Sequence, residues 1–424
     1  MSGVNRRAFL GGTGAALVGV GAAGSAHAMA APAPQEPTLT GADVLAAEGW
    51  QRLSGRRLGV ITNPTGVLST GPRALHHVVD AMHTSEVVEI AAVFGPEHGF
   101  RGTAQAGGSE GDYADPRTGL PVYDAYGADA EKLAGMFAKA GVEQIVFDIA
   151  DVGARFYTYI WTMWTAMRAA KRTGLGVVVL DRPNPIGGTV DGPMLDPAFS
   201  SGIGELPIVQ QHGMTAGELA RLFDAVHLPE AEGGSLEQLD VIEVRGWSRD
   251  DMFSATGLPW VTPSPNMPTP DTAALYPGTG LFEGTLLSEG RGTTRPFEII
   301  GAPGIDWRWA DEINAAGLRG VRARETYFVP TFSKHAEQTC GGVQLHRWEQ
   351  ARPITVAVTM LVTARRLYPD VFGWRPDMMI DKLAGTDRLR TMIDSGAGTD
   401  EVVGSWEGEV AEFRRLRQPH LIYG

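Results

Sequence analysis

Short apolar runs alternate with amphipathic segments along the first half of the chain. Four runs are rich in Val and Ile and are closed by Asn, Gly, Pro or Asp, at residues 56–62, 87–94, 143–149 and 176–181. Runs of this length and composition are typical of strands buried in a sheet. Three segments with helical spacing lie between them, at residues 73–83, 129–141 and 157–174. Strands that alternate with helices predict an α/β fold, here a Rossmann-like, doubly wound parallel sheet with helices on both faces.

A proline-rich segment interrupts this alternation. A further helix is predicted over residues 215–226 and a strand over 240–247, and residues 259–270 then contain five prolines in twelve positions. Such a segment marks a crossing between domains. Beyond it lies a stretch rich in Gly, Glu and Arg, and the pattern at residues 353–369 predicts a long core helix. We therefore predict a Rossmann-like domain over residues 41–265 and a smaller α+β auxiliary domain over residues 271–424.

The N-terminal residues have the pattern of an export signal. Arg6 and Arg7 precede a weakly apolar run that ends in Ala26-His27-Ala28, which predicts a twin-arginine signal peptide over residues 1–28. Residues 29–40 are interpreted as a Pro/Ala linker. Residues 19–24 match G-x-G-x-x-G, but a cleavage site follows where a dinucleotide fold needs a helix, so no nucleotide cofactor is expected. The mature protein is expected in a periplasmic, cell-surface or secreted location.

Composition excludes several other classes. The chain has 36 basic against 49 acidic residues, which argues against a nucleic-acid partner because such binding depends on clustered Lys and Arg. Its one cysteine, Cys340, cannot form an internal disulfide, and the ten histidines are scattered without metal-ligand spacing. Neither a metal nor a cofactor is expected, and no membrane span is expected in the mature chain.

The predicted strand ends indicate where chemistry should lie. Polar, turn-forming clusters follow the four strands at residues 62–66, 95–102, 148–159 and 181–188. Ligands of doubly wound sheets bind beyond the carboxyl ends of the strands. The site is therefore expected on that edge of the sheet.

Several of these clusters carry a family resemblance. The following segments occur in this order within about residues 45–350: "ITNPTG", "FGPEHGFRG", "FDIADVGARFYTYI", "LDRPNPIGG", "QHGMTAGELA", "PSPNMPT", "YPG", "FEGT" and "SEGRGTTRPFEIIGAP". Together they resemble the exo-β-N-acetylmuramidase (NamZ-type) family of glycoside hydrolases. The resemblance implies release of N-acetylmuramic acid from the non-reducing end of peptidoglycan fragments, in cell-wall turnover or recycling, at a cleft between the two domains. The alternative is an exported muropeptide- or sugar-binding protein that uses the same cleft without catalysis.

Glycoside hydrolysis requires a proton donor for the leaving oxygen. Glu97 is the first candidate, because it follows a strand at a Pro-Gly corner where apolar neighbours are expected to raise its pKa. His98 beside it is expected to relay a proton or hold the carboxylate. The alternative is that Glu97 caps a turn and His98 packs against a wall.

Four residues are candidates for the second catalytic group, and the sequence does not rank them. Asp148 and Asp151 lie three residues apart at a strand end, where they could instead cap the helix that starts near Tyr157. Glu283 and Glu289 lie in the glycine-rich stretch, where Glu289 could instead pair with a neighbouring arginine. Retention, inversion and participation of the substrate's own acetamido group all stay open.

A muramic acid substrate carries a lactyl carboxylate, and arginine binds carboxylates at two points. Four arginines in the glycine-rich clusters are candidates for this contact: Arg101, Arg155, Arg291 and Arg295. Tyr157 and Tyr159 are expected to stack on the sugar, and Asn63, Asn184 and His212 are further candidates for substrate contacts. Thr215 and Glu218 are expected to form a helix capping box.

Three positions depart from the pattern of the resembled family. Ala150 stands where members usually have Gln, Leu286 where they have Asn, and Gly304 where they have Trp. These departures indicate a possible shift in substrate preference. Residues 107–111 match G-x-S-x-G, but without the flanking strand and helix that a serine esterase requires.

Overall fold

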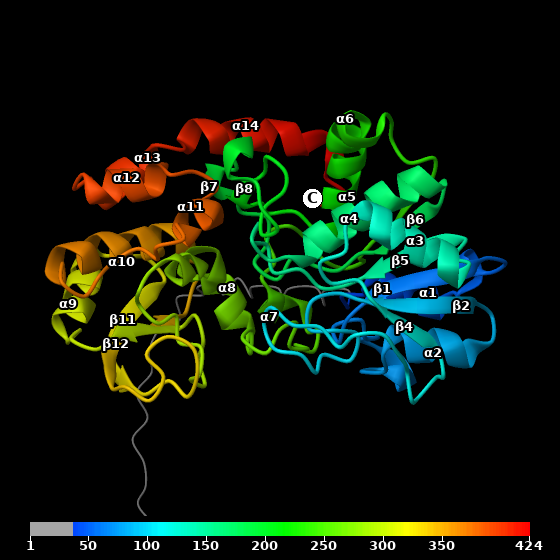
Figure 1. Ribbon diagram of the computed structural model, residues 1–424, viewed down its shortest axis with the longest axis horizontal. Helices are drawn as coiled ribbons and strands as arrows, with labels where there is room; N and C mark the ends of the chain where they lie inside the picture. Colours follow the sequence, from blue (N-terminus) through cyan, green and yellow to red (C-terminus); the bar gives the residue numbers. More distant parts are fainter. Residues whose placement is uncertain (1–36) are drawn as a thin grey trace, which may run out of the picture. The chain divides into compact units, whose positions relative to one another are not determined.

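A computed structural model describes residues 37–424 (Figure 1). The predicted signal peptide and residues 29–36 of the predicted linker lie outside the described residues. The last positions of that linker are well packed. Leu39 exchanges backbone hydrogen bonds with Arg245, and Thr40 forms a capping box with Asp43 at the start of α1 (Gly41–Ala47). Within residues 37–424, the first helix therefore begins at the predicted position, Gly41.

Within residues 37–424 a seven-stranded sheet has the order β3-β4-β2-β1-β5-β6-β9. Its strands are β1 (Arg57–Thr62), β2 (Glu89–Gly95), β3 (Tyr113–Ala114), β4 (Pro121–Asp124), β5 (Gln144–Asp148), β6 (Gly176–Leu180) and β9 (Leu239–Ile242). All neighbours pair in parallel except β3 and β4, which are antiparallel. The Rossmann-like fold and its four predicted strands are confirmed. The short strands β3 and β4 were not expected, because too few apolar residues mark them.

Helices cover both faces of this sheet because its strands are apolar on both sides. In β5, Ile145 and Phe147 belong to one buried cluster, whereas Val146 belongs to the other. Figure 1 shows α3 and α4 on one side of the sheet and α2 on the other. The helices of this half are α2 (Val78–Ser85), α3 (Ala130–Ala140), α4 (Tyr159–Thr173), α5 (Ala216–Leu222), α6 (Leu228–Glu232) and α7 (Phe253–Thr256).

The second half combines helices with small antiparallel sheets. Its elements are α8 (Pro270–Thr279), β10 (Ile299–Ala302), α9 (Arg308–Ala315), β11 (Val321–Phe328), β12 (Cys340–Arg347), α10 (Pro353–Leu367), α11 (Met379–Ala384), α12 (Arg388–Asp394), α13 (Thr399–Gly404) and α14 (Glu407–Arg417). The strands pair as β10-β12-β11, and a ribbon of β7 (Asp191–Met194) and β8 (Val209–Gln211) belongs to the first half. The predicted long core helix is α10. The α+β character of this half agrees with the prediction.

Buried arginines join the two halves. The fully buried guanidinium of Arg155 donates to the carbonyls of Pro193 and Ile208 and, across the halves, to that of Leu383. Arg417 on α14 donates to the carbonyls of Gly188 and Gly213. The described residues accordingly belong to one compact unit. Within residues 37–424, no helix is both long and apolar enough to cross a membrane.

Candidate active site

Two adjoining cavities lie beside the corner that follows β2. The inner pocket has a volume of ≈ 120 Å³ and is lined by Glu97 and Tyr157 from the first half and by Tyr276 and Glu283 from the second. The outer cleft has a volume of ≈ 1350 Å³. Residues common to both linings are Glu97, Ala106, Asn266, Glu283, Arg291 and Met379. The two cavities therefore form one continuous site at the junction of the two halves.

Glu97 is held at this junction by two hydrogen bonds. The backbone N–H of Gly107 donates to Oε1 at 2.8 Å, and the hydroxyl of Thr158 donates to Oε2 at 2.9 Å. The tight corner needs Gly99, whose φ is 88°, because left-handed backbone favours glycine. The chain thereby turns from a buried strand directly into the pocket and presents a fixed carboxylate.

His98 does not hold the carboxylate of Glu97, contrary to the prediction. Its Nδ1 lies 3.0 Å from the carbonyl oxygen of Ala104, and its backbone N–H donates to Gly108. It lines the inner pocket but mainly fixes the loop that supplies Gly107. The apolar neighbours expected around Glu97 also face elsewhere, since Phe94 packs on Phe137 and Phe100 on His77.

Glu283 lines the inner pocket together with Glu97 and is the second carboxyl group there. It lies on the 3₁₀ turn Gly280–Gly284 that follows α8, and Arg291 Nη2 lies 3.0 Å from its Oε2. Burial raises the pKa of Glu283; Arg291 opposes this shift, and the like charge of Glu289 adds to it. A carboxyl group with a raised pKa beside a second carboxylate is a common arrangement for acid–base chemistry.

Glu289 is buried, although it lies in the glycine-rich stretch. Its carboxylate lies 3.2 Å from Arg291 Nε and 2.9 Å from Lys334 Nζ. The salt-bridge alternative is therefore the one found for Glu289, with Lys334 as an additional partner. Glu289 lines the outer cleft and orients Arg291, which in turn contacts Glu283.

Asp148 and Asp151 lie outside the linings of the inner pocket and outer cleft. Both oxygens of fully buried Asp148 accept hydrogen bonds from Arg182, at 2.6 and 3.0 Å. Asp151 lies 3.2 Å from His212 Nε2 and accepts from the N–H of Gly153. Neither residue caps α4, whose N-cap is Thr158. The expected capping role is therefore wrong, and the two carboxylates lie away from the cavities that Glu97 lines.

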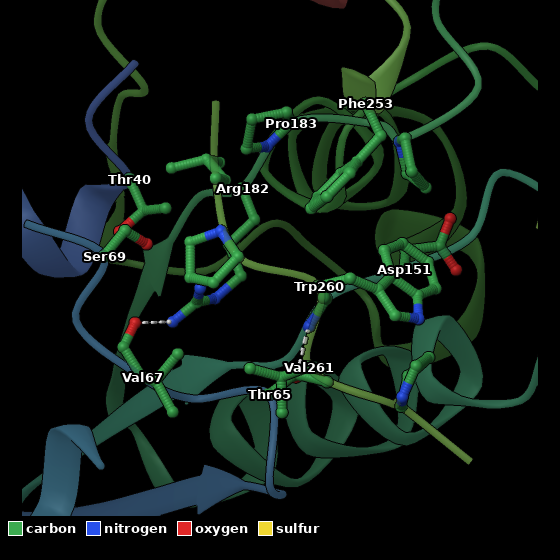
Figure 2. A pocket seen from close by; sticks show the side chains of 15 residues that line it. Thr40, Thr65, Val67, Ser69, Asp151, Arg182, Pro183, Phe253, Trp260 and Val261 are labelled. Carbon is green, nitrogen blue, oxygen red and sulfur yellow. Dashed lines mark hydrogen bonds between the residues drawn. The ribbon is translucent and has the colours of Figure 1, made fainter. Parts of the chain in front are cut away.

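Asp151 lines a separate small cavity at the edge of the sheet. Figure 2 shows Arg182, Phe253 and Trp260 among the side chains around it. Its volume is ≈ 40 Å³, room for only a few water molecules. Ala150 also lines it. This cavity is too small to hold a sugar.

Of the four candidate arginines, only Arg291 reaches the site. Arg101 is engaged by Asp80 and Asp115, Arg155 by backbone carbonyls, and Arg295 by Glu298. These three guanidinium groups lie outside the linings of the inner pocket and the outer cleft and bind structural partners there. Arg291 itself binds Glu283 and Glu289, so a lactyl carboxylate would have to compete with them.

Of the remaining candidate residues, two line the inner pocket and three do not. Tyr157 and Tyr159 line the inner pocket, as predicted for sugar contacts. Asn63 accepts from Thr65 within a turn, Asn184 donates to the carbonyl of Met214, and fully buried His212 pairs with Asp151. These last three lie outside both cavity linings and stabilise loops at the sheet edge.

Residues that sequence reasoning missed complete the inner pocket. Asn266 and Tyr276 line it, and Thr158 and Lys334 position its carboxylates. Asn266 lies in the proline-rich segment that was interpreted only as a domain crossing, although this segment belongs to the resembled motif "PSPNMPT". This motif is the sequence signal that could have identified Asn266 as a site residue.

Two buried polar groups of the inner pocket lack partners within residues 37–424. Asn266 Nδ2 and the hydroxyl of Tyr157 make no hydrogen bond, although the residues are only 5% and 8% exposed. Burial raises the pKa of Tyr157 well above its usual value, so the phenol keeps its proton and remains a donor. Buried donors of this kind are normally satisfied by protein, water or ligand. Their position beside Glu97 identifies the pocket as a polar ligand site.

Comparison with family models decides the relationship of the chain. The model described as "Exo-beta-N-acetylmuramidase NamZ, N-terminal" matches residues 58–271, and the corresponding C-terminal model matches residues 274–423. The chain belongs to the exo-β-N-acetylmuramidase NamZ family. The inner pocket combines Glu97 and Tyr157 from the NamZ N-terminal region with Tyr276 and Glu283 from the C-terminal region.

Known relatives agree with this assignment. The peptidoglycan β-N-acetylmuramidase NamZ of Bacillus subtilis (strain 168) is 43% identical over 388 residues, which cover 91% of each chain. Two crystal structures of DUF1343 family proteins from Bacteroides fragilis NCTC 9343 have TM-scores of 0.81 and 0.72 and identities of 32% and 30%. Each covers 92% of this chain, and the match spans 100% and 99% of the respective relative.

The three departures from the NamZ pattern lie in different environments. Ala150 borders the small cavity of Figure 2, and Leu286 lines the outer cleft. Gly304 lies outside both active-site linings with a φ of 92°, a conformation that suits glycine. Of the three, Leu286 is therefore the one placed to touch a substrate.

Proposed function

We propose that the protein is an exo-acting glycosidase that releases N-acetylmuramic acid from the non-reducing end of peptidoglycan fragments. Membership of the NamZ family and 43% identity to a peptidoglycan β-N-acetylmuramidase support this activity. The observation that carries it is the inner pocket, where Glu97 and Glu283 lie with the unpartnered donors of Tyr157 and Asn266. A binding protein would not require two carboxyl groups in the same pocket.

The two carboxyl groups have separate roles in this proposal. Glu97 donates its proton to the glycosidic oxygen as the bond from the anomeric carbon to that oxygen breaks, and the proton is replaced from the water that enters the product. Glu283 is the second group, which supports attack at the anomeric carbon. Thr158 and Gly107 are positioning groups for Glu97, and Arg291 is one for Glu283.

The dimensions of the site support exo action. The inner pocket of ≈ 120 Å³ lies next to an outer cleft of ≈ 1350 Å³. In this proposal the terminal sugar lies where the inner pocket opens into the outer cleft, with its polar groups meeting Asn266 Nδ2 and the Tyr157 hydroxyl. The remainder of the substrate extends into the outer cleft, so cleavage frees one sugar at a time.

The test is release of N-acetylmuramic acid from N-acetylmuramyl-N-acetylglucosamine. Glu97→Gln is expected to lower kcat by roughly 10²–10⁴-fold, the usual contribution of a general acid, while the disaccharide still binds. Glu131→Gln, an exposed change on α3, is the matched control and is expected to act like the parent. No sugar release by the parent protein would favour the binding-protein alternative, and near-normal turnover by Glu97→Gln would remove Glu97 from its role.

We also propose export by the twin-arginine route and action outside the cytoplasm. The support is the sequence alone, Arg6 and Arg7 before an apolar run that ends at Ala28. Changing Arg6 and Arg7 together to Lys is expected to retain the uncleaved protein in the cytoplasmic fraction. Unchanged export and processing of that variant would contradict the proposal.

A further inference from the structure

The loop between β11 and β12, residues 329–339, has an unusual backbone. Ser333, His335 and Glu337 have φ values of 71°, 54° and 63°. Non-glycine residues adopt this left-handed conformation at an energetic cost, and such positions persist where surrounding contacts hold them. Their concentration in one loop therefore indicates a conformation that the rest of the protein imposes.

The contacts that impose it come from the segment that bears Glu283 and Glu289. Lys334 Nζ donates to the carbonyls of Phe282 at 2.8 Å and Leu287 at 3.0 Å, in addition to its ion pair with Glu289. His335 Nε2 lies 2.8 Å from the carbonyl oxygen of Leu286, and Thr331 donates to Gly292. The loop is thus fixed directly to the catalytic segment and cannot move independently of it while these bonds persist.

This fixed loop presents an apolar surface to the outer cleft. Phe332 on the loop is 48% exposed and Leu286 on the catalytic segment is 45% exposed, and Val371 and Met379 complete the apolar lining. Aromatic rings in binding sites pack well against the C–H faces of ligands. The Lys and Arg side chains that line the same cleft are each paired with a carboxylate: Lys334 with Glu289, Arg291 with Glu283 and Arg375 with Asp377. Charge is therefore not the main recognition feature there.

The size of the outer cleft bears on the length of the substrate. Its ≈ 1350 Å³ compares with ≈ 120 Å³ for the inner pocket, and both cavities are lined by Glu97, Asn266 and Glu283. A leaving group attached to a sugar where the two cavities meet must enter the outer cleft. The cleft exceeds what one further sugar fills.

We propose that the outer cleft binds an oligosaccharide leaving group, with Phe332 as its stacking platform and Leu286 as the adjoining apolar wall. This inference rests on the proposed glycosidase function and defines its substrate class. The preferred substrates are glycan fragments longer than a disaccharide, and the sugars beyond the cleaved bond provide binding energy through Phe332.

The test compares kcat/KM for peptide-free N-acetylmuramyl-N-acetylglucosamine and for the tetrasaccharide made of two such repeats. The parent protein is expected to prefer the tetrasaccharide by roughly threefold to tenfold, the range of one good aromatic contact. Phe332→Ala is expected to bring this ratio close to one, and Phe332→Trp to retain it. Tyr327→Ala removes an aromatic side chain on β11 that is 57% exposed and lines neither cavity, so it is expected to leave the ratio unchanged.

The outcomes separate this inference from the function on which it rests. If the parent protein releases N-acetylmuramic acid equally well from both substrates, the inference fails and the glycosidase function stands. If neither substrate is cleaved, the proposed function fails. A tetrasaccharide preference that Phe332→Ala leaves intact would overturn the role of Phe332.

Discussion

Two groups of acidic residues lie near the carboxyl edge of the sheet, and their surroundings differ sharply. Asp148 ends β5 and Asp181 follows β6, and both are fully buried. Asp148 binds Arg182, and Asp181 accepts hydrogen bonds from the hydroxyls of Thr215 and Tyr423. We call these two residues the sealed acids. Neither residue lines the inner pocket or the outer cleft.

Glu97 and Glu283, the cleft acids, also have strong polar partners. Thr158 and Gly107 bind Glu97, and Arg291 binds Glu283. What distinguishes them is that both line the inner pocket beside donors that have no partner within residues 37–424. An arginine–carboxylate pair is therefore no guide to function by itself. We propose that access to a cavity with unsatisfied polar groups distinguishes a catalytic carboxyl group from a structural one.

Breaking a sealed pair should have the largest effect on stability. Arg182→Met leaves Asp148 buried without its cation, which costs about 3–5 kcal/mol of unfolding free energy. The loss should shrink as pH falls, because a protonated Asp148 needs no cation. Urea denaturation at two pH values measures this. Arg366→Met, which breaks the exposed pair with Glu312, is the control and should cost under about 1 kcal/mol; an equal loss in both variants would contradict the distinction.

Asp181 should make stability depend on pH. Burial raises its pKa from 3.8 to about 6, so the folded state binds more protons than the unfolded state between these values. Its contribution to stability is present at low pH and is lost as pH rises through 6, by roughly 3 kcal/mol. The difference in unfolding free energy between the parent and Asp181→Asn should fall by this amount from pH 4 to pH 7. A difference that stays constant with pH would show that folding does not raise the pKa of Asp181.

Removing one hydrogen bond from Glu97 should lower activity more than it lowers the free energy of unfolding. Thr158→Val removes one hydrogen bond to Glu97 and is expected to lower kcat/KM about tenfold, ~1.4 kcal/mol, with little change in unfolding. Thr158→Ser should retain most activity. Thr162→Val on the same helix tests for nonspecific effects, since Thr162 lies outside both cavity linings. Equal losses in the Thr158 and Thr162 valine variants would remove the positioning role.

Local patterns predicted the sheet and part of the site. The four Val- and Ile-rich strands, α4 and α10 are found as expected, and Thr215 and Glu218 form the predicted capping box. Glu97 could be identified because strand end, Pro-Gly corner and carboxylate are neighbours in sequence. Its hydrogen-bond partner Thr158 is 61 positions away, so no local pattern reveals it.

Long-range pairing explains the predictions that failed. Asp148 was one of four candidates for the second catalytic group, but its partner Arg182 comes from the next strand end. Arg155 lies in the polar cluster that follows β5, yet its guanidinium donates to the carbonyl of Leu383, 228 positions away. Which of the four candidate arginines lies at the site, and which of the four candidate carboxyl groups, depends on such distant partners. Contacts between distant partners are visible only in the folded chain.

The most direct test of the cleft acids is the dependence of activity on the leaving group. Rates of Glu97→Gln and Glu283→Gln are compared on the disaccharide, which has a poor leaving group, and on a nitrophenyl glycoside of N-acetylmuramic acid, which needs little protonation. Glu97→Gln is predicted to lose far more activity on the disaccharide, whereas Glu283→Gln loses activity on both substrates alike. Equal losses for Glu97→Gln on the two substrates, or the leaving-group pattern in Glu283→Gln, would contradict the assignment of Glu97 as the proton donor.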